Sequence, residues 1–162
     1  MSSFERLAVA GAVAISFFAL AGQESGSQKP DGYSRSMLRQ VHSTPNAPAA
    51  IGPYSQAIRA EGKLLYISGQ IPLKADGSLV QGDIKAQTEQ VMANIRAVLE
   101  AAGLSSKNVI KTTIFLTSMD HFAAVNEIYG KTFETEPPAR STVAVAGLPK
   151  GVDVEIETIA VY

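Results

Sequence analysis

The chain contains no cysteine. This absence excludes disulfides, thiolate nucleophiles and cysteine-ligated metals, and it leaves the redox state of the compartment undetermined. An excess of charge of either sign is also missing, since 14 Lys and Arg stand against 15 Asp and Glu. A formal net charge of -1 gives no general field to attract phosphates, and the sequence shows no local basic patch. We therefore expect no nucleic-acid partner.

Histidine is scarce, because only His42 and His121 occur and they lie far apart in the sequence. A Ser-His-Asp triad is not expected from this spacing. The acids Asp153, Glu155 and Glu157 alternate along one segment without a nearby His or Cys, which is typical of a polar strand face rather than a metal site. Neither a G-x-G-x-x-G motif after a strand nor a P-loop occurs. We therefore expect no metal and no cofactor.

The one long apolar run lies at residues 7–22, LAVAGAVAISFFALAG. It is shorter than the roughly 20 residues of a membrane-spanning helix, so no stable membrane span is expected. Arg6 precedes it, and Ala19 and Ala21 are spaced as in an A-x-A cleavage site. Residues 1–22 are therefore predicted to be a signal peptide, which would make the mature protein periplasmic or secreted. The alternative is an uncleaved N-terminal helix in a cytoplasmic protein.

The polar, aperiodic stretch that follows, residues 23–36, is predicted to be a flexible linker. The rest of the chain, residues 37–162, is long enough for one compact domain. Strand patterns are predicted over 54–60, 63–68, 109–117, 140–146 and 152–161. The first two are separated only by Glu61 and Gly62, which predicts a hairpin, and Gly69 is expected to end the second.

Two helices are predicted from the spacing of apolar residues. The first runs from Ile84 to Ala102, with Asp83 as its N-cap and Gly103 as a left-handed end. The second is capped by Asp120, carries Phe122, Val125, Ile128, Tyr129 and Phe133 on one side, and stops before the Pro137-Pro138 pair.

This order of elements predicts an α+β fold in which two helices pack on one face of a single sheet. The opposite face then leaves apolar surface uncovered. Because symmetric oligomers commonly cover such a face, we expect a homo-oligomer.

With nucleophile, metal and cofactor chemistry disfavoured, hydrolysis of an already electrophilic C=N bond is a reaction that the chain can support. The protein would orient the substrate, place one water and stabilise the developing charge. Arg140 suits the first task, because a guanidinium binds a carboxylate through two parallel hydrogen bonds. The alternative for Arg140 is a structural ion pair with Glu155 or Glu157, and these residues alone leave the choice open.

Five segments together resemble the RidA subfamily of the Rid (YjgF) family. They are NAPAAIGPYSQA at 46–57, YISGQIP at 66–72, VNEIY at 125–129, PPARSTVAV at 137–145 and LPKGVDVEIE at 148–157. The resemblance covers about Val41 to Tyr162. It implies a chorismate-mutase-like subunit and a homotrimer with three clefts between neighbouring subunits. It also implies hydrolysis of 2-iminobutanoate, 2-iminopropanoate and their enamine forms to 2-keto acids and ammonia.

The resemblance also implies roles for individual residues. Arg140 would bind the substrate carboxylate, and Glu155, with backbone groups near Thr142, would hold the attacking water. The residues that would line the pocket or support it are Tyr54, Ser68, Gly69 and Asn126. Tyr54 is otherwise a core tyrosine with a satisfied hydroxyl, and the Ser68-Gly69 pair otherwise reflects strand-end geometry. Thr142 stands where many relatives have cysteine, so regulation through a thiol is excluded, whereas hydrolysis needs no thiol.

Two rival functions follow from the same resemblance. Some members are described as endoribonucleases that inhibit translation, although the near-neutral charge and the lack of a basic-aromatic stripe argue against RNA binding here. The other rival is a non-catalytic ligand-binding or chaperone-like trimer, in which Arg140 binds carboxylates without turnover.

Overall fold

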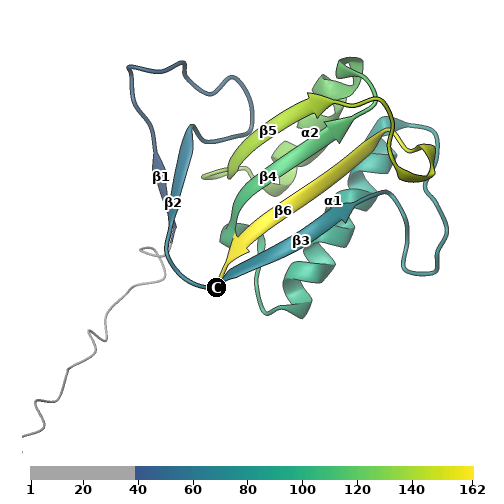
Figure 1. Cartoon of the computed structure of the whole chain (residues 1–162), viewed down its shortest axis with the longest axis horizontal. Coiled ribbons are helices and arrows are strands. Elements are labelled where there is room, and N and C mark those ends of the chain that lie inside the picture. Colours follow the sequence, from purple (N-terminus) through teal and green to yellow (C-terminus); the bar gives the residue numbers. More distant parts are fainter. Residues whose placement is uncertain (1–38) are drawn as a thin grey trace, which may run out of the picture. The chain divides into compact units, whose positions relative to one another are not determined.

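The structure is a computed structural model that describes residues 39–162. The predicted signal peptide and linker lie outside this range. The helices and strands are β1 (Arg39–His42), β2 (Ala57–Ala60), β3 (Leu64–Gln70), α1 (Ile84–Ala101), β4 (Val109–Leu116), α2 (Phe122–Thr132), β5 (Ala139–Ala144) and β6 (Val154–Val161) (Figure 1). Within residues 39–162, no helix is long and apolar enough to cross a membrane.

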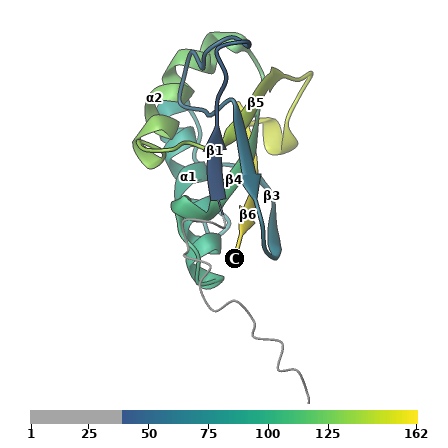
Figure 2. The same ribbon diagram turned by 90° about the vertical axis from the view of Figure 1, so that its left-hand side faces the viewer.

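The main sheet has the strand order β3-β6-β4-β5. Strands β4 and β5 run parallel and are connected through α2, whereas β6 is antiparallel to both of its neighbours. Both helices pack on one face of this sheet (Figure 2). Alternate residues of β6, among them Val154 and Ile156, are buried under the helices, and Glu155 and Glu157 between them are not. The α+β fold with two helices on one sheet face is therefore confirmed.

Helix α1 forms as its sequence predicts. Val91, Ile95 and Leu99 recur every four residues and are almost fully buried against the sheet. The Asp83 side chain accepts a hydrogen bond from the Lys85 backbone N–H, as an N-cap should. Gly103 follows the helix with a φ of 72°, in the left-handed region that glycine enters at little cost.

Helix α2 begins differently from the prediction. A 3-10 turn over Met119–His121 precedes it, and the residue that caps this turn is Ser118, whose hydroxyl accepts from the Asp120 backbone N–H at 3.1 Å. The prediction of Asp120 as the cap is wrong, because its carboxylate instead accepts from the Ser118 hydroxyl. The extra turn moves the start of the helical segment toward the N-terminus and leaves Asp120 inside it.

The predicted hairpin between residues 54–60 and 63–68 is also wrong. Strand β2 pairs with β1 in a separate two-stranded sheet, and β3 pairs with the C-terminal strand β6. Gly62 has a φ of 140°, a value that glycine adopts readily and other residues rarely do. The chain therefore continues from one sheet into the other. The short strand β1, which the sequence pattern did not indicate, supplies the partner that β2 needs.

Gly69 does not end β3, because the strand continues to Gln70 after a shift in register between Ile67 and Gln70. A Cβ atom on Gly69 would lie 1.8 Å from Oε1 of Glu155. Only glycine therefore allows the Glu155 side chain to lie across this part of the strand.

The face of the sheet opposite the helices carries exposed apolar side chains. Tyr66 is 70% exposed and Val143 is 43% exposed. In the register of the sheet, Phe115 lies between Val143 on one side and Glu155 on the other. This is the uncovered face that the sequence predicts.

Asp153 joins three parts of the fold at the start of β6. Its carboxylate accepts hydrogen bonds from the Thr117 hydroxyl at 2.8 Å and from Nε2 of Gln87 at 3.0 Å. Its backbone N–H donates to Oε1 of Gln87 in return. The bond from Thr117, followed by that from Gln87, holds the pKa of Asp153 below its usual value.

Because the folded-state pKa of Asp153 is depressed, its carboxylate stabilises the fold above the unfolded-state pKa, and this contribution is lost as the pH falls through the folded-state pKa. Asp153→Asn should therefore lower the free energy of unfolding at pH 7 by about 1 kcal/mol, a value kept small by solvent screening. The difference from wild type should shrink below about pH 4. Urea unfolding at pH 7, 5 and 3 measures this, and a difference that does not vary with pH would contradict it.

Candidate functional site

Arg140 lies near the start of β5 with its side chain directed toward the helices. In the sheet register it pairs with Thr112 of β4, which pairs in turn with Thr158 of β6. Both threonines are 1% exposed and belong to the helix-covered face. Because residues paired in register share a face of the sheet, Arg140 lies on that face too. Its Nη1 donates a hydrogen bond of 2.7 Å to Oδ1 of Asn126 on α2.

Three aromatic rings surround the Arg140 guanidinium. The distance from its Cζ to the ring centroid is 5.0 Å for Tyr129, 5.5 Å for Tyr54 and 5.8 Å for Phe122. Each lies within the range of about 6 Å in which a ring face attracts a cation. Phe122, Asn126 and Tyr129 follow one another at intervals of four and three residues on α2, so they share one face of the helix.

Phe122 and Tyr129 were expected only as core residues of the second helix. Tyr129 is a core residue, with 0% of its surface exposed, and it also faces the guanidinium. The signal that was available is the spacing of both rings around Asn126. This spacing places the Asn126 amide and the two rings on one face of α2. When that face lies beside β5, all three side chains can contact Arg140.

No Asp or Glu among residues 39–162 forms an ion pair with Arg140, since the ion pairs in this range join Arg39 to Glu136 and Lys85 to Glu127. The alternative of an ion pair with Glu155 or Glu157 is therefore wrong within the described chain. Burial lowers the pKa of Arg140, and Tyr129 and then Tyr54 oppose this effect. An arginine nevertheless stays protonated at any working pH. A partly buried cation without a counter-charge is a favourable place for an anion to bind.

The loop before β2 passes close to the guanidinium. A Cβ atom on Gly52 would lie 3.3 Å from Nη2 of Arg140, so a larger residue would crowd it. The Tyr54 hydroxyl accepts a hydrogen bond of 3.3 Å from the Ile51 backbone N–H. Ser55 then fixes the loop to β5, because it bridges Ala139 in parallel. The Tyr54 hydroxyl is thus satisfied, as in a core tyrosine, but its ring also faces Arg140.

Thr142 lies two residues after Arg140 and pairs with the buried Ile114, so it is on the same face of the sheet. Its hydroxyl oxygen is buried and has no hydrogen-bond partner among the described residues. The hydroxyl of Thr158 is in the same condition.

Ser68, Gly69 and Glu155 gather elsewhere. Glu155 alternates with the buried Val154 and Ile156, and it therefore lies on the open face of the sheet. Gly69 lies against the Glu155 carboxylate, with Ser68 next to it in β3 and exposed. The structure therefore divides the predicted site residues into two groups on opposite faces of the sheet. Arg140, Asn126, Tyr54 and Thr142 form one group, and Glu155, Gly69 and Ser68 form the other.

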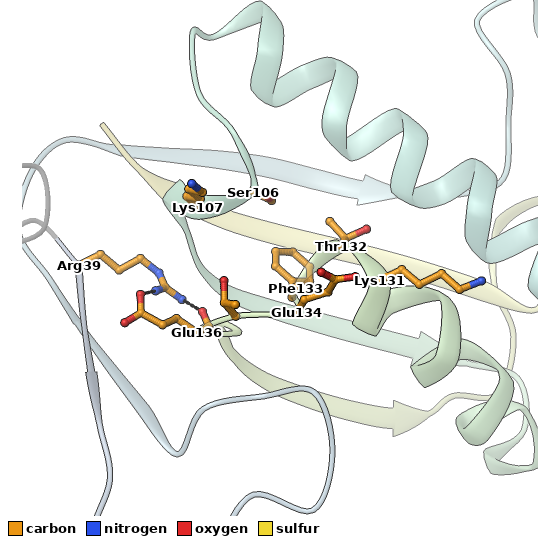
Figure 3. A pocket seen from close by; sticks show the side chains of 9 residues that line it. Arg39, Ser106, Lys107, Lys131, Thr132, Phe133, Glu134 and Glu136 are labelled. Atoms are coloured by element: carbon orange, nitrogen blue, oxygen red, sulfur yellow. Dashed lines mark hydrogen bonds and ion pairs between the residues drawn. The ribbon is translucent and has the colours of Figure 1, made fainter.

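A pocket of about 360 Å³ lies at the C-terminal end of α2 (Figure 3). Lys107, Lys131 and Phe133 help to line it, and at one side Arg39 pairs with Glu136 and donates to the Val109 carbonyl. None of the predicted site residues lines this pocket. Among the described residues, no group of three or more His, Asp or Glu is placed to hold a metal ion.

Residues 44–162 match the family model described as Endoribonuclease L-PSP. The mouse protein named 2-iminobutanoate/2-iminopropanoate deaminase is 48% identical over 127 residues, which cover 78% of this chain and 93% of that protein. Protein DfrA from Myxococcus xanthus is 53% identical over 129 residues, covering 78% and 98% of the two chains. The crystal structure of RidA from an Antarctic Psychrobacter species has a TM-score of 0.59 and 45% identity, covering 76% of this chain and 99% of that one.

The two unsatisfied hydroxyls predict an unusual response to substitution. Thr142→Val and Thr158→Val should each raise the free energy of unfolding by about 1 kcal/mol, because they remove a buried oxygen that has lost its water without gaining a partner. Thr112→Val is the matched control, since the Thr112 hydroxyl lies 2.8 Å from the Tyr129 hydroxyl and is buried with it. Its loss should destabilise the fold by about 1–3 kcal/mol.

Thermal or urea unfolding of the three variants tests this comparison. Equal destabilisation by all three would show that Thr142 and Thr158 have partners after all.

Proposed function

The chain belongs to the Endoribonuclease L-PSP family, also called the Rid (YjgF) family, and on this premise we propose that it hydrolyses 2-imino and 2-enamino acids to 2-keto acids and ammonia. Relatives that carry the name 2-iminobutanoate/2-iminopropanoate deaminase support this choice of substrate. The observation that carries the proposal is the Arg140 guanidinium, which is partly buried and has no acidic partner within the described subunit.

In this proposal, Arg140 binds the substrate carboxylate. A guanidinium has five N–H donors, and among the described residues Arg140 uses one of its N–H groups, on Nη1, to hold Asn126. The other N–H groups of the guanidinium are therefore available to donate hydrogen bonds to a carboxylate, in a place from which water is partly excluded. The aromatic rings lie beside the fork and hold it without competing for its charge.

Glu155 is proposed to act from a neighbouring copy. Since Arg140 and Glu155 lie on opposite faces of one sheet, no rotation of either side chain brings them together within a subunit. A homotrimer that packs the open face of one copy against the Arg140 side of the next would place the two groups in one cleft. The exposed Tyr66 and Val143 on the open face support such packing.

The proposed reaction needs only water. An enamine first takes a proton on carbon and becomes the iminium ion, which is the protonated form of the imine. Water then attacks the carbon of the protonated C=N bond, and the Glu155 carboxylate accepts a proton from this water. The proton then passes from Glu155 to the carbinolamine nitrogen and the C–N bond breaks to release ammonia. The hydroxyl proton returns to the Glu155 carboxylate as the C=O bond of the 2-keto acid forms. Tyr54, Ser68 and Gly69 are proposed to shape the pocket around the imine end, and backbone groups near Thr142 to help hold the water.

Arg140→Ala should lower kcat/KM for 2-iminobutanoate by about a hundredfold or more, because a desolvated charge pair is lost. The trimer should persist, since this arginine contributes no ion pair to the described fold. Arg140→Lys should retain about a tenth of the activity, because it keeps the charge and loses the planar fork. The imine is generated in situ with an amino-acid oxidase, and release of 2-keto acid is followed.

Unfolding of Arg140→Ala would instead favour a structural role for Arg140. If the wild type does not accelerate release of the 2-keto acid, the non-catalytic binding protein is favoured.

The composite site is tested by mixing two inactive variants. Arg140→Ala and Glu155→Gln should each be poorly active alone. Co-expressed in equal amounts, they should form mixed trimers in which roughly a quarter of the clefts combine an intact Arg140 with an intact Glu155. Activity should recover in that proportion. Trimers that mix without regaining activity would show that the two residues do not act across the interface.

Ribonuclease activity is a second candidate, favoured by the description of the family model. The formal net charge of -1 argues against it. We expect purified protein in low salt to leave RNA intact. Cleavage that Arg140→Ala abolishes would support the ribonuclease, whereas cleavage that persists in that variant would indicate a contaminant.

A further inference from the structure

Tyr129 has the closest of the three rings that face Arg140. Its centroid lies 5.0 Å from Cζ of the guanidinium, against 5.5 Å and 5.8 Å for Tyr54 and Phe122. Tyr129 is also the one ring of the three that is fully buried. Since desolvation strengthens the attraction between a cation and a ring face, the contact with Tyr129 should be the strongest.

The Tyr129 ring is itself held in place on two sides. Its hydroxyl lies 2.8 Å from the hydroxyl of Thr112, and its ring centroid lies 4.7 Å from that of Phe133. Thr112 is also the residue that pairs with Arg140 in the sheet. Thr112 of β4 therefore contacts the Tyr129 hydroxyl and also pairs with the backbone of Arg140, so it fixes the position of the ring relative to the arginine. Burial raises the pKa of the Tyr129 hydroxyl, so the ring stays neutral at working pH.

We propose that Tyr129 is a positioning residue, which fixes the Arg140 guanidinium in the direction in which it binds the carboxylate of a ligand. The inference rests on the proposed role of Arg140 in carboxylate binding. A carboxylate in place of the ring would fix the guanidinium equally well but would compete with the ligand for its charge. A neutral ring and the neutral Asn126 amide hold the cation and leave that charge available.

Tyr129→Leu tests the proposal through carboxylate affinity. The KM for 2-iminobutanoate and the Kd for the unreactive 2-oxobutanoate should both rise by about threefold to thirtyfold, the range expected for loss of a cation–π contact. The value of kcat should change less, because the carboxylate is held alike in the bound substrate and in the transition state.

Phe133→Leu is the matched control. It removes a buried ring that packs on Tyr129, and Phe133 is not among the three rings that face Arg140. It should lower Tm, as Tyr129→Leu does, but raise KM and Kd clearly less, because the Tyr129 ring stays beside Arg140 and is still held by the Thr112 hydroxyl. If both variants raise KM and Kd alike, Tyr129 is only part of the core and the proposal is overturned.

A second series avoids the cavity that leucine leaves. Tyr129→Phe keeps the ring and should keep the Kd for 2-oxobutanoate within about threefold of the wild type. Phenylalanines with one, two or three ring fluorines at position 129 keep the shape and progressively weaken the negative face of the ring. Kd should rise with each fluorine, and the absence of a trend would overturn the proposal.

Binding of 2-oxobutanoate also separates this inference from the proposed function. If the wild type binds 2-oxobutanoate through Arg140 but hydrolyses no imine, the proposed deaminase function is wrong. The proposed role of Tyr129 in carboxylate binding would still hold. If the wild type binds it no better than Arg140→Ala does, the inference is overturned, because there is no carboxylate site for Tyr129 to organise.

Discussion

The described part of the chain is organised around a positive charge, that of Arg140, which no carboxylate within it neutralises. Burying an ion without a partner costs several kcal/mol, so folded chains usually pair it or leave it in water. Arg140 is partly buried, and the described residues offer it an amide and three ring faces but no carboxylate. Strand β5, one face of α2 and the loop at Gly52 all converge on it. The fold is stable because its other contacts outweigh the free-energy cost of this buried charge. Binding of an anion beside Arg140 would reduce that cost.

In the proposed mechanism, the period of two along a strand makes the site depend on assembly. Arg140 pairs in register with Thr112, and Glu155 pairs with Phe115, three residues further along β4. Because an offset of three residues is odd, the side chains of Arg140 and Glu155 must point to opposite faces of the sheet. Under the proposed mechanism, a single subunit has a carboxylate-binding group and a separate water-binding group. Assembly joins the two in one cleft, and activity is then linked to the association of copies.

Local patterns predicted the elements that local physics decides. The spacing of Val91, Ile95 and Leu99 and the cap at Asp83 gave α1, and the alternation of acids with apolar residues gave β6. Pairing between strands is a long-range property, and there the prediction failed. Glu61 and Gly62 looked like a hairpin turn, yet β3 gains more from pairing with the buried β6 than from pairing with the short β2.

The candidate site residues were taken from five sequence segments, which could not predict the face of the sheet on which each residue lies. Which face Arg140 occupies depends on the register of β4, β5 and β6, and no single segment contains that register. The Tyr129 ring was placed correctly in the core, and its second role appeared only when α2 was laid beside β5. Periodicity tells which residues are buried together on one helix, whereas the partner of that face comes from the topology of the sheet.

Buried polar groups without a partner differ in whether they indicate a functional site. Thr142 and Thr158 each bury a hydroxyl without a partner, and such a group costs about 1–3 kcal/mol. Only Thr142 shares its strand with Arg140, and Thr158 lies in the core. An orphaned hydroxyl therefore does not identify a site by itself, because the core tolerates one at modest cost. An unpaired cation costs more, because removing a charge from water without a counter-charge is costlier than removing a hydroxyl. Under the proposed function, the carboxylate of the substrate supplies the missing charge.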